Sequence, residues 1–239
     1  MLKSLLLILT LLSNSAFANK EAVIQNLSRF FGEINKQDIS ASPFKGVYEV
    51  VTYNPIDSML VSEDGRYLIQ GDVVDLTTRS LIQKSSRVKN LKLALIDSIN
   101  DNDKIFYPAQ NERYQIHVFT DVDCPFCSRL HNNMTRMNDA GISVKYLASP
   151  LASLHPTAQG KMQKIWCAAD RNQAMDDYNK DGTIVDSPPC NDPVATQLAI
   201  SQQLSVTGTP AIFLSDGTHL PGFLSADKLL RKIQKTLGK

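Results

Sequence analysis

Two cysteines separated by two residues, Cys124 and Cys127, lie where a predicted strand gives way to a predicted helix. The sequence predicts the strand over residues 115–120 and the helix over residues 124–138. Unpaired backbone N–H groups and the positive end of the dipole stabilise a thiolate in the first turn of a helix. Cys124 is therefore predicted to be a nucleophile near neutral pH. Cys127, one turn later, is predicted to be a more buried thiol that attacks a mixed disulfide.

The segments around this motif alternate between strand and helix patterns, which predicts an α/β domain over residues 104–239. The elements expected after the motif are a strand over 142–147, helices over 158–178 and 192–204, a strand pair over 211–220, and a final helix capped by Ser225. This order fits a thioredoxin-like fold with a helical insertion.

The residues Thr209 and Pro210 directly precede the predicted strand at 211–214. In thioredoxin-like folds, a cis-proline loop at this point of the topology packs against the C-x-x-C motif. We therefore expect a cis Thr209–Pro210 bond, although the trans form is favoured for X–Pro bonds in general. Thr209 would then offer its backbone to an extended substrate segment by strand addition.

The first 18 residues have the three parts of a secretory signal peptide. Lys3 gives a positively charged N-terminal region, and residues 5–12 form an almost wholly apolar region. Small residues up to Ala18 then form the predicted cleavage site. The apolar run falls short of the roughly 20 residues that span a bilayer, which makes a membrane anchor the weaker alternative. We therefore expect export, a mature chain from Asn19 and no membrane insertion.

Residues 19–80 are predicted to form a small α+β dimerisation domain. Its expected elements are a helix over residues 20–31 closed by Gly32, a strand over 44–53, and a hairpin over 58–70 with Asp64-Gly65 at the turn. A unit of this size has a marginal hydrophobic core. Its exposed sheet edge would gain stability by pairing with a second copy, so we expect a homodimer.

Residues 81–103 are predicted to link the two domains as a helix. The apolar residues Val88, Leu91, Leu95 and Ile99 recur at helical spacing, with charged residues between them. An exposed amphipathic helix of this kind would act as a spacer about 25 Å long.

Composition and motifs limit the classes of partner and cofactor. The chain has 25 basic and 24 acidic side chains, which is not the charge balance of a nucleic-acid-binding protein. It has no Gly-rich phosphate loop and no serine-nucleophile elbow, and we expect no cofactor. Zinc at the C-x-x-C is a weak alternative, because Cys167 and Cys190 lie far apart and no His stands at ligand spacing. An inert short-loop disulfide is a second alternative.

The other polar residues near the motif have less specific interpretations. Asp121 and Asp123 flank the nucleophile and could assist proton transfer, although capping or solvation explains them equally well. His131 lies one turn after Cys127 and could tune the charge of the site, but a solvent-facing histidine is the favoured interpretation. The remaining histidines at 117, 155 and 219 form no cluster in the sequence.

Several short motifs resemble those of the periplasmic disulfide isomerases of the DsbC/DsbG family over nearly the whole mature chain. These motifs are Phe119-Thr-Asp121 before Cys124-Pro-Phe-Cys127, Leu130-His131, Ile165-Trp-Cys167-Ala, Gly208-Thr-Pro-Ala211, and Gly71 after Leu68-Ile-Gln70. The resemblance implies a homodimer whose thioredoxin-like domains face a shared cleft. It also implies a periplasmic location and a membrane thiol reductase of the DsbD type as electron donor.

Two features point to different branches of that family. The dipeptide Pro125-Phe126 is nearer to the Pro-Tyr of DsbG types than to the Gly-Tyr of DsbC types, whereas the pair Cys167 and Cys190 favours DsbC. We interpret this pair as a structural disulfide. A redox-active pair is the alternative, but neither cysteine has an activating C-x-x-C or a clear helix N-terminus.

The predicted activity is that of a periplasmic thiol:disulfide oxidoreductase that reshuffles incorrect disulfides in misoxidised secreted proteins. The Cys124 thiolate would form a mixed disulfide with the substrate, which a substrate thiol or Cys127 then resolves. Two alternatives remain open: a DsbG-like reductase of sulfenylated cysteines, and a chaperone-like binding module with secondary redox activity.

Overall fold

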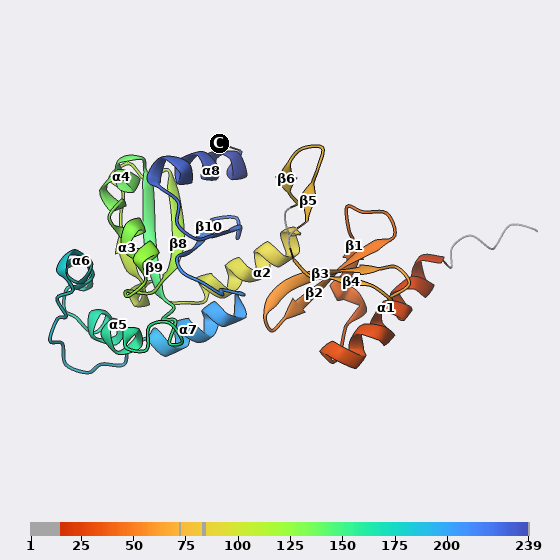
Figure 1. The fold of residues 1–239 in the computed structure, drawn as a ribbon, viewed down its shortest axis with the longest axis horizontal. Coiled ribbons are helices and arrows are strands. Elements are labelled where there is room, and N and C mark those ends of the chain that lie inside the picture. Colours follow the sequence, from red (N-terminus) through yellow and green to blue (C-terminus); the bar gives the residue numbers. More distant parts are fainter. Residues whose placement is uncertain (1–14, 72, 83–84, 239) are drawn as a thin grey trace, which may run out of the picture. The chain divides into compact units, whose positions relative to one another are not determined.

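The computed structural model describes residues 15–71, 73–82 and 85–238, and the chain divides into units of residues 1–84 and 85–239 (Figure 1). Most of the predicted signal peptide lies outside the described residues. Residues 15–18 form the start of the first helix, which crosses the predicted cleavage site. None of the described helices combines the length and the apolar character that crossing a membrane requires.

The first unit is a four-stranded antiparallel sheet that packs on one helix. Its elements are α1 (Ser15–Phe31), η1 (Lys36–Asp38), β1 (Ile39–Ala41), β2 (Val47–Tyr53), β3 (Ile56–Ser62) and β4 (Leu68–Ile69), in the strand order β1-β2-β3-β4. Val23 and Leu27 of α1 pack against Val50, Met59 and Val61 of the sheet. Buried apolar residues of α1, β2 and β3 therefore give this small unit its core.

The predicted hairpin in this unit is present, with Val61 paired to Leu68 and Gly65 at φ +71° in its turn. Its second strand, β4, is only two residues long and exposes both of its side chains. A separate short hairpin, β5 (Val74–Asp75) and β6 (Ser80–Leu81), follows it.

The second unit is a five-stranded mixed sheet between helices. Its elements are α2 (Ser86–Asp97), η2 (Asp101–Asp103), β7 (Ile105–Tyr107), β8 (Tyr114–Thr120), α3 (Pro125–His131), α4 (Met134–Asp139), β9 (Ile142–Ala148), α5 (Ala158–Trp166), α6 (Arg171–Asp181), α7 (Val194–Gln203), β10 (Ala211–Leu214), β11 (His219–Pro221) and α8 (Ala226–Leu237). The strand order is β11-β10-β8-β9-β7, and only β8 and β9 are parallel. This is the predicted thioredoxin-like arrangement with extra helices.

The helix α2 is not the exposed spacer that the sequence suggested. Ser85 caps it, and Val88 and Ile96 are fully buried. Ile96 packs with Phe119 and Phe213 of the central sheet. The apolar stripe that indicated an amphipathic helix therefore faces the second unit, of which α2 is a part.

We expect Gly217→Ala to destabilise the second unit by breaking the contact between α2 and the β10–β11 turn. Gly217 has φ +79°, and an added Cβ would lie 2.1 Å from the carbonyl oxygen of Lys89. The left-handed backbone alone costs a non-glycine residue about 1–2 kcal/mol, and the clash adds to this. Denaturant unfolding measures the loss. Gly160→Ala in α5 is the matched control: nothing lies within 4 Å of its added Cβ, and it should leave stability unchanged or raise it. Equal stability of the two variants would contradict the prediction.

Candidate active site

The strand β8 and the helix α3 place the C-x-x-C motif at the junction that the sequence predicted. Cys124 is the N-cap residue of α3, and Pro125 occupies the first turn. Cys124 and Cys127 are both free thiols, exposed by only 6% and 4%. The Thr209–Pro210 bond is cis, and the Cys124 Sγ lies 3.4 Å from the Thr209 carbonyl oxygen. The structure therefore places the C-x-x-C motif beside the Thr209–Pro210 loop.

The two thiols differ in acidity. A hydrogen bond from Cys127 lowers the pKa of Cys124 to about 5, and Thr209 and the backbone N–H groups of Phe126 and Cys127 add to this effect against the opposing influence of burial. Burial raises the pKa of Cys127, and its hydrogen bond to Cys124 acts in the same direction. Cys124 is therefore a thiolate at neutral pH, while Cys127 keeps its proton.

Asp121 is a fully buried carboxylate beneath the motif. Its oxygens accept hydrogen bonds from the backbone N–H of Asp123 at 2.8 Å and of Leu151 at 2.7 Å, and they lie 2.9 Å from Nδ1 of His155. The hydrogen bond to Asp121 raises the pKa of His155, and the charge of Cys124 acts in the same direction. Sequence reasoning missed the role of His155, because a separation of 34 residues gives no local signal.

The helical insertion contacts the residue that precedes the nucleophile. Lys161 of α5 lies 2.8 Å from both carboxylate oxygens of Asp123, and the Tyr178 hydroxyl of α6 donates to the same carboxylate. Burial opposes ionisation of Asp123, but the bonds from Lys161 and Tyr178 prevail and hold its pKa below the usual range. The carboxylate that lies beside Cys124 in the sequence is therefore neutralised by a cation.

His131 is not the solvent-facing histidine that the sequence favoured. Its side chain is only 11% exposed, and its Nε2 lies 2.9 Å from Asp176 Oδ1 of α6. Its ring packs against Tyr107 and Tyr146, with centroid distances of 5.4 and 5.8 Å. The remaining histidines, His117 and His219, lie on β8 and β11.

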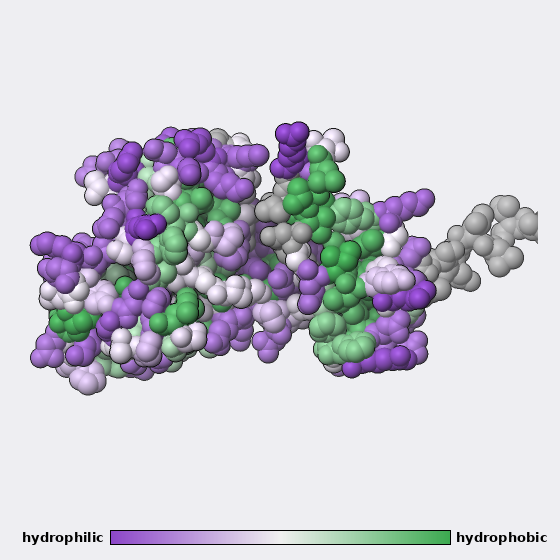
Figure 2. Space-filling view, viewed as in Figure 1, coloured by the Kyte–Doolittle hydropathy of each residue, from purple (hydrophilic) through white to green (hydrophobic). Residues whose placement is uncertain are grey.

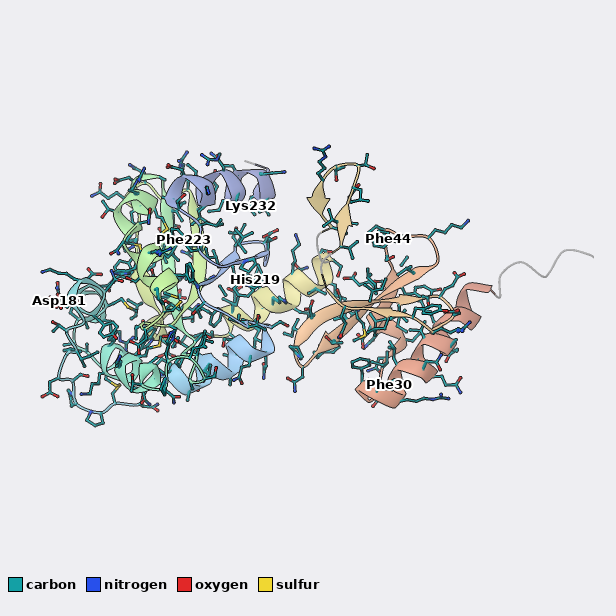
Figure 3. All side chains as sticks on the ribbon, in the orientation of Figure 1. Phe30, Phe44, Asp181, His219, Phe223 and Lys232 are labelled. Carbon is teal, nitrogen blue, oxygen red and sulfur yellow. A yellow bond between two sulfur atoms is a disulfide. The ribbon has the colours of Figure 1, made fainter. Side chains whose placement is uncertain are left out.

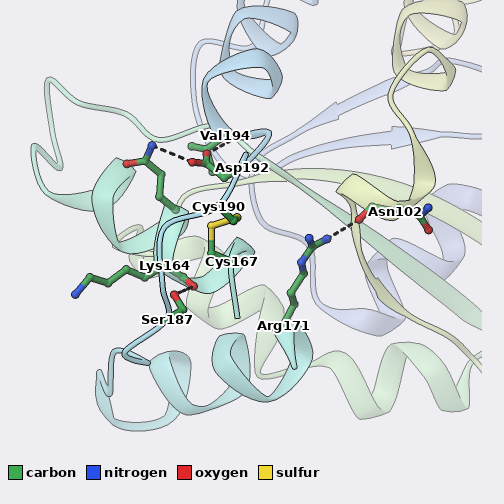
Figure 4. The surroundings of a disulfide bond; sticks show 9 residues. Asn102, Lys164, Cys167, Arg171, Ser187, Cys190, Asp192 and Val194 are labelled. Carbon is green, nitrogen blue, oxygen red and sulfur yellow. Dashed lines mark hydrogen bonds between the residues drawn. A yellow bond between two sulfur atoms is a disulfide. The ribbon is translucent and has the colours of Figure 1, made fainter. Parts of the chain in front are cut away.

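Cys167 and Cys190 form a disulfide that ties the C-terminal end of α5 to the segment before α7 (Figure 4). The Ser187 hydroxyl donates to the Lys164 carbonyl at 2.6 Å beside it. Across the described parts of the chain, no group of three or more His, Cys, Asp or Glu side chains could hold a metal ion.

Comparison with known proteins identifies the family. Residues 101–237 match the thioredoxin-like domain family, and residues 14–85 match the disulfide bond isomerase protein N-terminal domain. The thiol:disulfide interchange protein DsbC of Dickeya dadantii (strain 3937) is 36% identical over 89% of this chain and 85% of its own length. The chain belongs to the DsbC family of thiol:disulfide interchange proteins. DsbC of Escherichia coli (strain K12) is 34% identical over 90% of this chain and 88% of its own length.

A solved structure of a disulfide interchange protein from Neisseria gonorrhoeae is 31% identical, with a TM-score of 0.52 over 57% of this chain and 99% of its own. Membership in the DsbC family makes this protein a thiol:disulfide oxidoreductase with a DsbC-type N-terminal domain and a thioredoxin-like domain.

Proposed function

We propose that this DsbC-family protein is a periplasmic protein disulfide isomerase. The unequal acidity of the two active-site thiols is the observation that carries the proposal. Cys124 is ionised and can attack a substrate disulfide, whereas Cys127 stays protonated until a mixed disulfide has formed. The Cys124 thiolate attacks a substrate disulfide, forms a mixed disulfide and releases one substrate thiolate. A second substrate thiol displaces Cys124 and completes isomerisation, or Cys127 displaces the substrate, which leaves it reduced and the enzyme oxidised.

The low pKa of Cys124 also favours the reduced state that isomerisation needs. A stabilised thiolate lowers the free energy of the dithiol relative to the disulfide. Each time Cys127 resolves a mixed disulfide, however, the active-site dithiol is oxidised to a disulfide. The cycle therefore requires an external electron donor. We assign this role to a membrane thiol reductase of the DsbD type, as the family membership suggests.

The surface around Cys124 is suited to bind misoxidised secreted proteins. Phe126 and Leu154 are large apolar side chains that are 51% and 69% exposed. The guanidinium of Arg129 lies over the Phe126 ring at 5.3 Å. Together with the Thr209 backbone, these residues would hold an extended apolar segment whose cysteine approaches Cys124.

The N-terminal unit is the proposed dimerisation module. Its exposed large apolar residues include Tyr67, Leu68 and Ile69 at the edge strand β4, and Val74 and Leu76 of the β5–β6 hairpin. Figure 2 shows hydrophobic surface gathered on this unit around the β5–β6 hairpin. Phe30, at the end of α1, is a further exposed aromatic residue (Figure 3). An exposed β4 edge surrounded by apolar side chains suits pairing with a second copy. A monomeric mass at all concentrations would contradict the dimer.

Refolding of a scrambled multi-disulfide protein tests the isomerase function. With a catalytic amount of the reduced protein, we expect native disulfides to form many times faster than in buffer. The dipeptide Pro125-Phe126 motivates a parallel assay on a protein with one sulfenylated cysteine. If the protein speeds reduction of the sulfenylated substrate but does not increase the yield of native disulfides, its function is that of a sulfenic-acid reductase and not that of an isomerase. Suppression of aggregation alone would indicate a chaperone-like binding module.

A further inference from the structure

A small cavity of about 10 Å³ lies directly behind Cys127. Cys127 and His131 of α3, Asp121 after β8, and Tyr146 of β9 contribute to its lining. A volume of this size is room for about one water molecule, provided that polar atoms surround it.

Two buried polar atoms of the lining residues have no hydrogen-bond partner within the described protein. These are the hydroxyl oxygen of Tyr146, whose side chain is only 1% exposed, and Nδ1 of His131. Buried polar groups are nearly always paired with protein or with water, because leaving them unpaired costs about 1–3 kcal/mol. Both residues line the same cavity as Cys127. They therefore indicate a hydrated site behind that thiol.

The other ring nitrogen of His131 determines what Nδ1 can do. Nε2 lies 2.9 Å from the Asp176 carboxylate, which can only accept, so Nε2 carries the proton and Nδ1 presents a lone pair. The Tyr107 hydroxyl donates to the same carboxylate at 2.7 Å and fixes it in place. Burial lowers the pKa of His131 against the opposing effect of Asp176, so the ring is a neutral acceptor.

We propose that His131, held by Asp176, accepts the proton of Cys127 through one water molecule in this cavity. The proposal rests on the proposed function, because it concerns the step in which Cys127 resolves the mixed disulfide. The Cys127 S–H proton passes to the water as the water gives a proton to Nδ1. The Cys127 thiolate then attacks the Cys124 sulfur. The Cys124–Cys127 bond forms, the bond from Cys124 to the substrate breaks, and the substrate leaves as a thiolate.

This assignment gives Cys127 a base that Cys124 does not need. Cys124 is already ionised at neutral pH, whereas Cys127 must lose its proton before it can attack. Beyond the cavity, His131 and Asp176 also line a larger groove at the surface, through which the proton can reach solvent. The ionisable residues that line the cavity or the groove with His131 come from its own helix and from the elements packed against it: Cys127 of α3, Asp121 after β8, Tyr107 of β7, Tyr146 of β9, and Asp176, Tyr178 and Lys180 of α6.

Asp121 is the competing acceptor, since it also lines the cavity. Its carboxylate already interacts with the N–H groups of Asp123 and Leu151 and with His155. Each of these interactions occupies an acceptor position on one of the two carboxylate oxygens. Nδ1 of His131, in contrast, is an acceptor with no hydrogen-bond partner among the described residues.

Single-turnover oxidation of the reduced protein by oxidised glutathione tests the proposal. Acid quenching and mass spectrometry separate the second-order formation of the Cys124–glutathione mixed disulfide from its first-order resolution by Cys127. We expect His131→Phe, which keeps an aromatic ring, to slow resolution at least about tenfold at pH 7 and to change formation by less than about twofold. Asp176→Asn and Tyr146→Phe should slow resolution by smaller factors.

The pH profile separates proton transfer from a structural effect. Resolution in the wild type should level off above the pKa of His131, whereas in His131→Phe it should keep rising with pH and approach the wild-type rate in alkali. Equal resolution rates, or a parallel loss at every pH, would overturn the proposal. So would a loss confined to Asp121→Asn. A wild type that forms no mixed disulfide would contradict the proposed function as well, and that outcome is distinct because it shows in the formation phase.

Discussion

Replacement of Cys124 by serine is expected to lower isomerase activity at least about 1000-fold, to the level of buffer. A serine hydroxyl is not ionised at neutral pH, and removal of an enzyme's nucleophile has effects of this size or larger. The serine side chain is nearly isosteric with that of cysteine, so the fold should be retained. The yield of native disulfides from a scrambled substrate measures the loss, and thermal unfolding checks the fold.

Cys127→Ser is the matched variant, since it changes the same atom one turn along α3. The proposed mechanism predicts that this variant still isomerises, because a substrate thiol can displace Cys124. Net reduction of substrate should disappear, and mixed disulfides between Cys124 and substrate should accumulate. A Cys124→Ser protein that remains active, or a Cys127→Ser protein that is equally inactive in isomerisation, would contradict this division of roles.

The thiolate of Cys124 should form with a midpoint near pH 5, about four pH units below the ordinary thiol value of 9.0. At pH 7 about 99% of Cys124 would then be ionised, against about 1% for an ordinary thiol. The ultraviolet absorbance of the thiolate, with Cys124→Ser as the blank, measures this midpoint. Alkylation should follow the same pH profile, although its absolute rate gains less because nucleophilicity falls with pKa. A midpoint above pH 8 would refute the electrostatic account of the site.

The same shift has a consequence for stability. The pKa of Cys124 is lower in the folded than in the unfolded chain, so ionisation stabilises the folded dithiol form. This contribution is complete above about pH 9 and is lost as the pH falls towards about 5. The reduced wild type should therefore lose stability relative to Cys124→Ser between these pH values. Urea unfolding under reducing conditions measures the difference.

Local patterns in the sequence predicted most of the fold. The hairpin around Gly65 and the junction at Cys124 each depend on a few neighbouring residues, and both are present. The three-residue strand β7 was missed, because its pairing with β9 is fixed by distant residues. The helix predicted over residues 158–178 divides into α5 and α6. The break lies at Cys167, which forms the disulfide with Cys190. Helical periodicity reports only local spacing and therefore does not predict a break at such a tertiary contact.

The candidate site was predictable only in part, because several of its contacts join residues that are far apart in the sequence. The C-x-x-C and the Thr209–Pro210 loop have strong local signals. The partners of the nearby carboxylates do not: His155 reaches Asp121 across 34 residues and Lys161 reaches Asp123 across 38. The burial of His131 depends on aromatic residues from two strands and a carboxylate from α6. Such contacts follow from how the chain folds back on itself, and a single sequence does not show them.

The two cysteine pairs of the second unit need opposite redox states. Cys124 and Cys127 must be reduced for isomerisation, whereas the Cys167–Cys190 bond closes the end of α5, the helix that carries Lys161 to Asp123. Cys190 lies in an exposed loop, so burial does not shield that bond completely. An electron donor for this protein therefore has to reduce the Cys124–Cys127 pair and leave Cys167–Cys190 intact, through the surface on which it docks or through a difference in reduction potential between the two pairs. A reductant that opened both pairs would also release the end of α5.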